Sequence, residues 1–180
     1  MGNAVVIYKS KYGSTKKYAE WITKALNCEM LEGSNITIDK VLEYDIIIYL
    51  GGLYASGING VSFITKNFEK LKQKELIVCT VGLADPNIKS QFKPIIDKNF
   101  TEDMKNSIRI FHLRGGINYK ELGIIHKSMM AMLKKTVKNK KEEELTDEDR
   151  MMLDTYGDVV DFTDENTIEP IISYVRECAK

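Results

Sequence analysis

The order of apolar and amphipathic segments constrains the fold of this chain more than any other feature. Five apolar runs, rich in β-branched residues, alternate with stretches whose apolar residues recur at helical spacing. Three of the runs are nearly continuous, which is typical of parallel strands covered on both faces. The runs are Ala4–Tyr8, a weaker one near Glu29–Leu31, Asp45–Leu50, Leu76–Val81 and Ile108–Leu113.

The segments between these runs predict helices. Apolar residues share one helical face from Tyr18 to Leu26, and again from Val61 to Leu71. We expect a third helix over about 87–97, with Pro94 in its middle, and a final helix between Asp164 and Cys178. Strands that alternate with helices imply right-handed crossovers. The sequence therefore predicts an α/β fold with a doubly wound parallel sheet.

Length and composition predict a single domain over residues 1–180. The regular pattern changes over about 119–156, where a basic segment, KSMMAMLKKTVKNKK, precedes an acidic one, EEELTDEDR. We interpret this region as a helical insertion. The formal net charge of +0 gives no global attraction for nucleic acid. The three cysteines form no CxxC motif, so we expect a reducing, cytoplasmic setting.

The loop after the first apolar run, Ser10–Thr15 (SKYGST), is a candidate anion site. It lies at the carboxyl end of a strand and the start of a helix, where free N–H groups favour a phosphate. Gly13 would let the backbone curl around the anion, and three hydroxyl groups could donate to it. The loop has neither a GxGxxG nor a Gly-Lys-Ser/Thr motif. A simple helix cap by Ser or Thr is the alternative interpretation.

Two further loops lie at the same predicted edge of the sheet. GGLYASGING, residues 51–60, follows the third run, and TVGLADPN, residues 80–87, follows the fourth. Small residues and one exposed tyrosine, Tyr54, would suit a flat aromatic ligand. Glycine-rich turns also simply follow strands, so each loop alone has a purely structural interpretation. The coincidence of three such loops at one edge favours a binding site.

The residues SKYGST resemble the phosphate loop of flavodoxins, Thr/Ser-x-Thr/Ser-Gly-x-Thr, with Tyr12 as a departure at the third position. The resemblance implies a flavodoxin-like five-stranded sheet of order 2-1-3-4-5, with helices on both faces and a helical insertion after the fifth strand. It also implies FMN as the cofactor, with GGLYAS beside the isoalloxazine ring and VGLAD along its pyrimidine edge. The implied FMN-binding residues are Ser10, Lys11, Tyr12, Gly13, Ser14, Thr15, Gly52, Leu53, Tyr54, Ala55, Val81, Gly82, Leu83, Ala84 and Asp85.

Within the flavodoxin-like superfamily, the chain most resembles menaquinone-dependent protoporphyrinogen dehydrogenases, through GGINY, the Met-rich insertion and DVVDFTDENTIEPI. This resemblance implies an FMN-dependent oxidoreductase that passes electrons to a quinone. The alternative is a flavodoxin-type electron carrier for a redox partner protein. No catalytic triad, carboxylate pair or metal cluster is visible, and His112 and His126 suit strand-end and helix-surface positions better than a catalytic role.

The insertion carries an apolar stripe from Leu122 to Val137, with lysines beside it. One interpretation of residues 119–141 is a surface that contacts a membrane or receives a quinone or porphyrin, because basic amphipathic helices favour anionic lipid. The other is a helix packed on the domain with its lysines in solvent. The stripe is Leu122, Ile125, Met129, Met132, Leu133 and Val137, and the lysines are Lys127, Lys134, Lys135 and Lys138.

Overall fold

The computed structural model describes residues 3–54 and 57–179. Its main sheet contains five parallel strands in the order β2-β1-β3-β5-β6, and the short β4 pairs antiparallel with the end of β3. The predicted doubly wound, flavodoxin-like sheet is confirmed. The strands are β1 (Ala4–Lys9), β2 (Glu29–Glu32), β3 (Ile46–Tyr54), β4 (Gly57–Ile58), β5 (Glu75–Gly82) and β6 (Ile108–Arg114).

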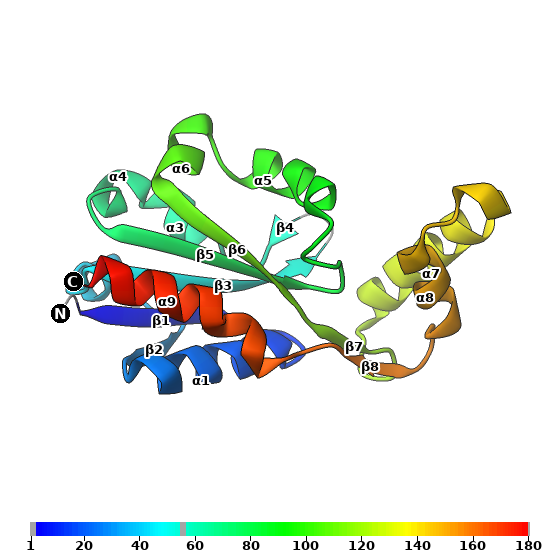
Figure 1. Ribbon diagram of the computed structural model, residues 1–180, viewed down its shortest axis with the longest axis horizontal. Coiled ribbons are helices and arrows are strands. Elements are labelled where there is room, and N and C mark those ends of the chain that lie inside the picture. Colours follow the sequence, from blue (N-terminus) through cyan, green and yellow to red (C-terminus); the bar gives the residue numbers. More distant parts are fainter. Residues whose placement is uncertain (1–2, 55–56, 180) are drawn as a thin grey trace.

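Both faces of the sheet are covered by helices (Figure 1). Successive residues of β1 point to opposite cores: Val6 packs with α1 and α9, whereas Val5 and Ile7 pack with α2 to α6. Because both faces of the sheet are buried, side chains on both faces of a strand are apolar, and the sequence of the strand is a continuous apolar run. The helices that cover the two faces are α1 (Ser14–Leu26), α2 (Ile38–Val41), α3 (Ser62–Lys66), α4 (Phe68–Leu71), α5 (Lys93–Asn99), α6 (Glu102–Ser107) and α9 (Glu169–Cys178).

The insertion leaves the sheet at the carboxyl ends of the strands and projects away from the helical layers (Figure 1). Its base is a small antiparallel pair, β7 (Gly116–Asn118) and β8 (Val159–Asp161). Between these strands lie α7 (Ile124–Lys138) and α8 (Asp147–Asp154). The start of β1 and the end of α9 lie at the opposite end of the molecule (Figure 1).

Several predicted elements differ from the observed ones. The helix expected over Val61–Leu71 is two helices, because Asn67 leaves helical geometry and its side-chain amide donates to the carbonyl of Phe63. The helix expected over about 87–97 starts at Lys93 instead, which places Pro94 in the first turn, where its missing N–H costs nothing. The same rule starts α9 beside Pro170.

The two predicted ligand loops are shorter than expected. Strand β3 continues through Gly51 to Tyr54 because β4 pairs with its end, and β5 continues to Gly82 beside β6. Helix α6, capped by the Thr101 hydroxyl, and the β7–β8 pair had no counterpart in the sequence interpretation. The carboxyl edge of the sheet therefore presents extended strand ends as well as turns.

Candidate functional site

The loop between β1 and α1 has the geometry of an anion-binding turn. Gly13 has φ 96°, a backbone conformation that residues with a side chain rarely adopt, and its N–H donates to Ser10 Oγ at 3.1 Å. Gly13 is the N-cap of α1 and therefore supplies no side chain to cap it. The helix-cap interpretation fails at this position, because the first N–H groups of α1 are left for another acceptor.

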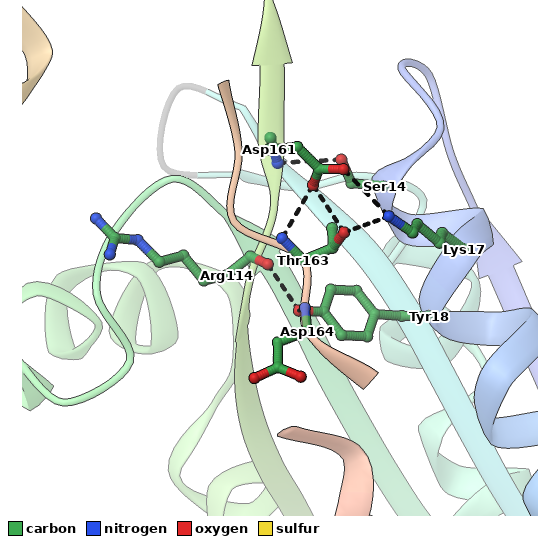
Figure 2. A network of polar contacts seen from close by, with 8 residues as sticks. Ser14, Lys17, Tyr18, Arg114, Asp161, Thr163 and Asp164 are labelled. Carbon is green, nitrogen blue, oxygen red and sulfur yellow. Dashed lines mark hydrogen bonds and ion pairs between the residues drawn. The ribbon is translucent and has the colours of Figure 1, made fainter. Parts of the chain in front are cut away.

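A polar network fixes the first turns of α1 against the base of the insertion (Figure 2). Ser14 Oγ accepts from the N–H of Gly116 at 3.1 Å, which joins the phosphate loop to β7. Lys17 Nζ lies 3.1 Å from Asp161 Oδ2 and 2.6 Å from Thr163 Oγ1. The hydroxyl of Thr163 and this ammonium lower the pKa of the Asp161 carboxyl. The carboxylate thus stays ionised and holds β8 on α1.

Tyr18 extends this network into the core. Its ring is fully buried, and its hydroxyl donates to the carbonyl oxygen of Arg114 at 2.8 Å while accepting from the N–H of Asp164 at 3.2 Å. Figure 2 shows the hydroxyl between these two backbone groups. One phenol therefore joins the end of β6 to the chain that returns from the insertion.

The phosphate loop borders a cavity of about 150 Å³ at the edge of the sheet. Its walls come from the loop after β1 and the start of α1, from the ends of β3 and β5, and from the starts of β7 and α7. Apolar side chains and backbone dominate the lining, as in sites for flat aromatic ligands. The lining residues are Ser10, Tyr12, Ser14, Thr15, Leu53, Tyr54, Val81, Gly82, Leu83, Gly115, Gly116, Ile117, Leu122, His126, Met129 and Met130.

Three aromatic rings meet in this cavity. The imidazole of His126 stacks on the ring of Tyr54, with centroids 5.0 Å apart and planes 14° apart. His126 Nδ1 lies 2.7 Å from the hydroxyl of Tyr12, which also accepts from the N–H of Gly123 at 3.3 Å. A phenol that accepts from Gly123 can still donate its own proton, and Nδ1 accepts that proton in the neutral tautomer that carries its hydrogen on Nε2. Burial and the nearby ammonium of Lys11 lower the pKa of His126, which favours this neutral form.

Most of the predicted FMN-binding residues surround this cavity, but some do not. Lys11 is exposed, with its ammonium 5.6 Å from the Tyr12 ring centroid, and Gly52 packs against the ring of Tyr54. Ala84 lines a neighbouring cavity, and the Asp85 carboxylate accepts hydrogen bonds from Asn87 within its own turn. Gly13 shapes the loop through its backbone. Ala55 lies outside the described residues.

The sequence interpretation missed the part of the cavity that the chain after β6 supplies. Gly115 packs tightly between Val81 and Ser14, where an added Cβ would come within 3.0 Å of Val81. A glycine pair directly after a strand at the ligand edge was the available signal. The missed lining residues are Gly115, Gly116, Ile117, Leu122, His126, Met129 and Met130.

A second cavity, of about 460 Å³, lies between the insertion and the segment that follows β5. Leu83, Ile117 and Met130 line both cavities, so the two adjoin. The walls are mainly apolar, and the Lys140–Asp149 ion pair (2.7 Å) contributes to them. The remaining lining residues are Ala84, Gln91, Tyr119, Leu133, Val137, Thr146, Met151, Met152, Thr155, Val160 and Phe162.

The apolar stripe of α7 divides between the inside and the outside of the molecule. Leu122 and Val137 are buried, whereas Ile125 and Met132 are 75% and 72% exposed. The adjacent Ile124 is 85% exposed. The stripe thus lines the cavities on one side and meets solvent on the other. Among the residues that the structure describes, no helix combines the length and apolarity needed to cross a membrane.

The other histidine lies apart from the cavity. His112 stacks on Phe92, with ring centroids 3.7 Å apart, and its Nδ1 lies 2.7 Å from the hydroxyl of the buried Thr80. Burial lowers its pKa to about 4, so it is neutral at physiological pH. The expectation of a structural strand residue suits this environment. Across residues 3–54 and 57–179, no group of three or more acidic, histidine or cysteine side chains could hold a metal ion.

The sheet order and the phosphate loop at its carboxyl edge define a flavodoxin-like α/β protein. The sequence matches the family model described as flavodoxin domain over residues 5–144, and the chain belongs to this family. Membership assigns FMN as the cofactor and a redox role to the protein. The structure fits FMN at its phosphate end, where a positive-φ glycine and an uncapped helix start offer N–H donors.

The solved structures to which the chain is similar are distant in sequence. A flavodoxin, WrbA-like protein from Agrobacterium tumefaciens is 20% identical, over 50% of this chain and 66% of that one, with a TM-score of 0.41. The Trp repressor binding protein from Bacillus subtilis is 20% identical over 63% and 83%, with a TM-score of 0.46. Oxidised flavodoxin 2 from Bacillus cereus is 17% identical over 62% and 84%, with a TM-score of 0.45. A search of curated proteins found no match.

Proposed function

We propose that the protein is an FMN-dependent oxidoreductase of the protoporphyrinogen dehydrogenase type that passes electrons to a quinone. The observation that carries this proposal is the 460 Å³ cavity of the insertion, which adjoins the FMN cavity. Its volume lies within the range of small-molecule sites, about 300–1,000 Å³. An electron carrier that serves only partner proteins has no need of an apolar cavity beside its flavin.

The lining of this second cavity suits an uncharged, flat and apolar substrate. Its one ammonium group, on Lys140, is paired with Asp149, so the pair adds little net charge. Met130, Met151 and Met152 supply flexible, polarisable side chains that adapt to different ring shapes. A quinone or a porphyrinogen belongs to the class of molecule that such a site accepts.

The chain's own residues would position the reactants. FMN, when bound, supplies the electron transfer, and the protein orients it and excludes water. The N–H groups of the phosphate loop would hold the phosphate. Arg114 Nε donates to the carbonyl oxygen of Leu83 at 3.1 Å, and its guanidinium lies 4.0 Å from the Phe162 ring centroid. This arginine therefore fixes Leu83, one of the wall residues that the two cavities share.

The two candidate functions differ in how the flavin is reduced. We expect anaerobic titration of the FMN-loaded protein, followed by visible absorption, to show reduction in a single two-electron step. Two resolved one-electron steps would favour the flavodoxin-type carrier for a redox partner protein. That result would contradict the dehydrogenase proposal.

Substitutions on α7 test the cavity itself. Leu133→Glu places a carboxylate in the apolar cavity at a position that is 46% exposed, so the fold should survive. We expect it to weaken the binding of a water-soluble naphthoquinone at least tenfold, because an unpaired charge would be desolvated. Met132→Glu, on the same helix but outside the cavities, is the matched control. Equal binding by both variants would show that the quinone does not use this cavity.

We also propose that α7 contacts a membrane surface. Ile124, Ile125 and Met132 are exposed large apolar side chains, and Lys127, Lys135 and Lys138 are exposed on the same helix. This combination favours anionic lipid. We expect co-sedimentation with vesicles that contain anionic lipid, and loss of it when the three lysines are replaced by glutamine. Unchanged binding of the lysine variant would contradict the proposal.

A further inference from the structure

The stacked pair of Tyr54 and His126 holds the position at which a flavin ring would enter. The two planes differ by only 14°, so the rings are nearly parallel and form a closed stack. Their 5.0 Å separation is that of a stacked aromatic pair with nothing between them. The cavity of about 150 Å³ is correspondingly smaller than common ligand sites.

The other wall of the cavity offers no ring that could replace His126. The end of β5 contributes Val81, Gly82 and Leu83. Among the residues described around the cavity, the aromatic side chains are Tyr12, Tyr54 and His126. The Tyr12 ring stands edge-on to Tyr54, at 71°, and therefore does not present a parallel face. His126 is thus the ring that lies parallel to Tyr54.

The outer side of the start of α7 faces solvent. Ile124 and Ile125 are exposed, so little packs against the outer side of this turn. The Tyr12 hydroxyl is hydrogen-bonded to both Gly123 and His126, and these contacts connect the first turn of α7 to the phosphate loop. A ring inserted between Tyr54 and His126 needs about 3.5 Å to each of them, or roughly 7 Å in all, so the stack would have to widen by about 2 Å.

We infer that His126, a residue of the insertion, forms the second face of the FMN site and sandwiches the isoalloxazine ring against Tyr54. The inference concerns the cofactor site alone and stands apart from the identity of the substrate. It makes the insertion a part of the flavin site. It also gives His126 a positioning role, because the imidazole would contact the ring face without exchanging a proton.

Binding measurements with FMN and riboflavin test the sandwich. We expect His126→Ala to weaken both ligands by about 3- to 10-fold, because an aromatic stack has been lost and riboflavin retains the ring. His126→Phe should restore most of this affinity. Ser128→Ala, an exposed position on the same helix outside the FMN cavity, is the matched control. Quenching of flavin fluorescence gives the dissociation constants.

Imidazole NMR signals provide a second readout. The chain has two histidines, and His112 stacks on Phe92 away from the cavity, so it serves as the internal reference. On addition of FMN, the His126 ring protons should shift upfield while those of His112 stay in place.

Three results would overturn the inference. They are unchanged or tighter FMN binding by His126→Ala, failure of His126→Phe to restore affinity, and an unshifted His126 signal in the FMN-bound protein. Tighter binding would identify His126 as a plug that the flavin displaces. Failure of the native chain to bind FMN would overturn the cofactor assignment and this inference with it, whereas the first three results leave that assignment intact.

Discussion

Replacing Gly13 with alanine tests whether the backbone of the phosphate loop holds FMN. A Cβ built on Gly13 meets no atom within 4 Å, so steric conflict within the protein plays no part. The cost comes from φ 96°, which is strained for any residue with a side chain. Such strain is worth about 1–3 kcal/mol. In the FMN-free variant the loop can relax to an unstrained backbone conformation at residue 13. FMN binding must then restore the strained conformation, so the affinity for FMN should fall about 5- to 150-fold.

Gly157 is a close control for this substitution. It has φ 102°, and a Cβ built on it also meets no atom within 4 Å, but it lies in the turn before β8 and does not border the FMN cavity. Gly157→Ala should lose a similar amount of stability in urea denaturation and keep its FMN affinity. Riboflavin, which lacks the phosphate, should bind Gly13→Ala almost as well as the native chain. Equal FMN affinity of Gly13→Ala and native protein, or an equal loss in Gly157→Ala, would refute the reasoning.

Three further predictions follow from polar groups that are buried or half-buried. Thr15→Val, at a buried position of the phosphate loop, should weaken FMN about tenfold in fluorescence titration through loss of a hydroxyl donor to a charged acceptor, and full affinity would contradict this. Tyr18→Phe should lower the free energy of unfolding by about 1–3 kcal/mol in urea, because two backbone partners of the hydroxyl lose a hydrogen bond. His112 has a folded-state pKa of about 4, below the value of about 6.5 in the unfolded chain, so the unfolded state binds more protons between these values. For this half-buried group the difference in pKa contributes about 2 kcal/mol to the free energy of unfolding above pH 6.5, and this contribution should be lost as the pH falls towards 4. The free energy of unfolding of His112→Gln should therefore decline less steeply over that pH range than that of the native chain.

The polar network at the base of the insertion could not be predicted from the sequence. Lys17 and Asp161 are separated by 144 positions, and the Tyr12–His126 contact spans 114. Neither pair leaves a local pattern, since a strand or helix period reports only the nearest neighbours along the chain. For this reason the sequence predicted a helix-surface position for His126, although its ring stacks on Tyr54 inside the cavity.

The break between α3 and α4 has a similar cause. The apolar residues of Val61–Leu71 keep a helical period throughout, so the period alone predicts one continuous helix. The Asn67 side chain donates to the carbonyl of Phe63, and the residue leaves helical geometry there. Competition between side chain and backbone for one carbonyl is a local event that hydrophobic spacing does not record.

The sequence by itself determined the sheet and the phosphate loop. Continuous apolar runs require cover on both faces, and a glycine between two hydroxyl residues at a strand end permits a positive φ. The tertiary structure alone decided how the insertion is used, because its apolar stripe could equally pack inward or face solvent. It does both: Leu122 closes the FMN cavity while Ile125 stays exposed. The β7–β8 pair and the contacts of α1 fix that orientation, and they join segments that meet only after the chain has folded.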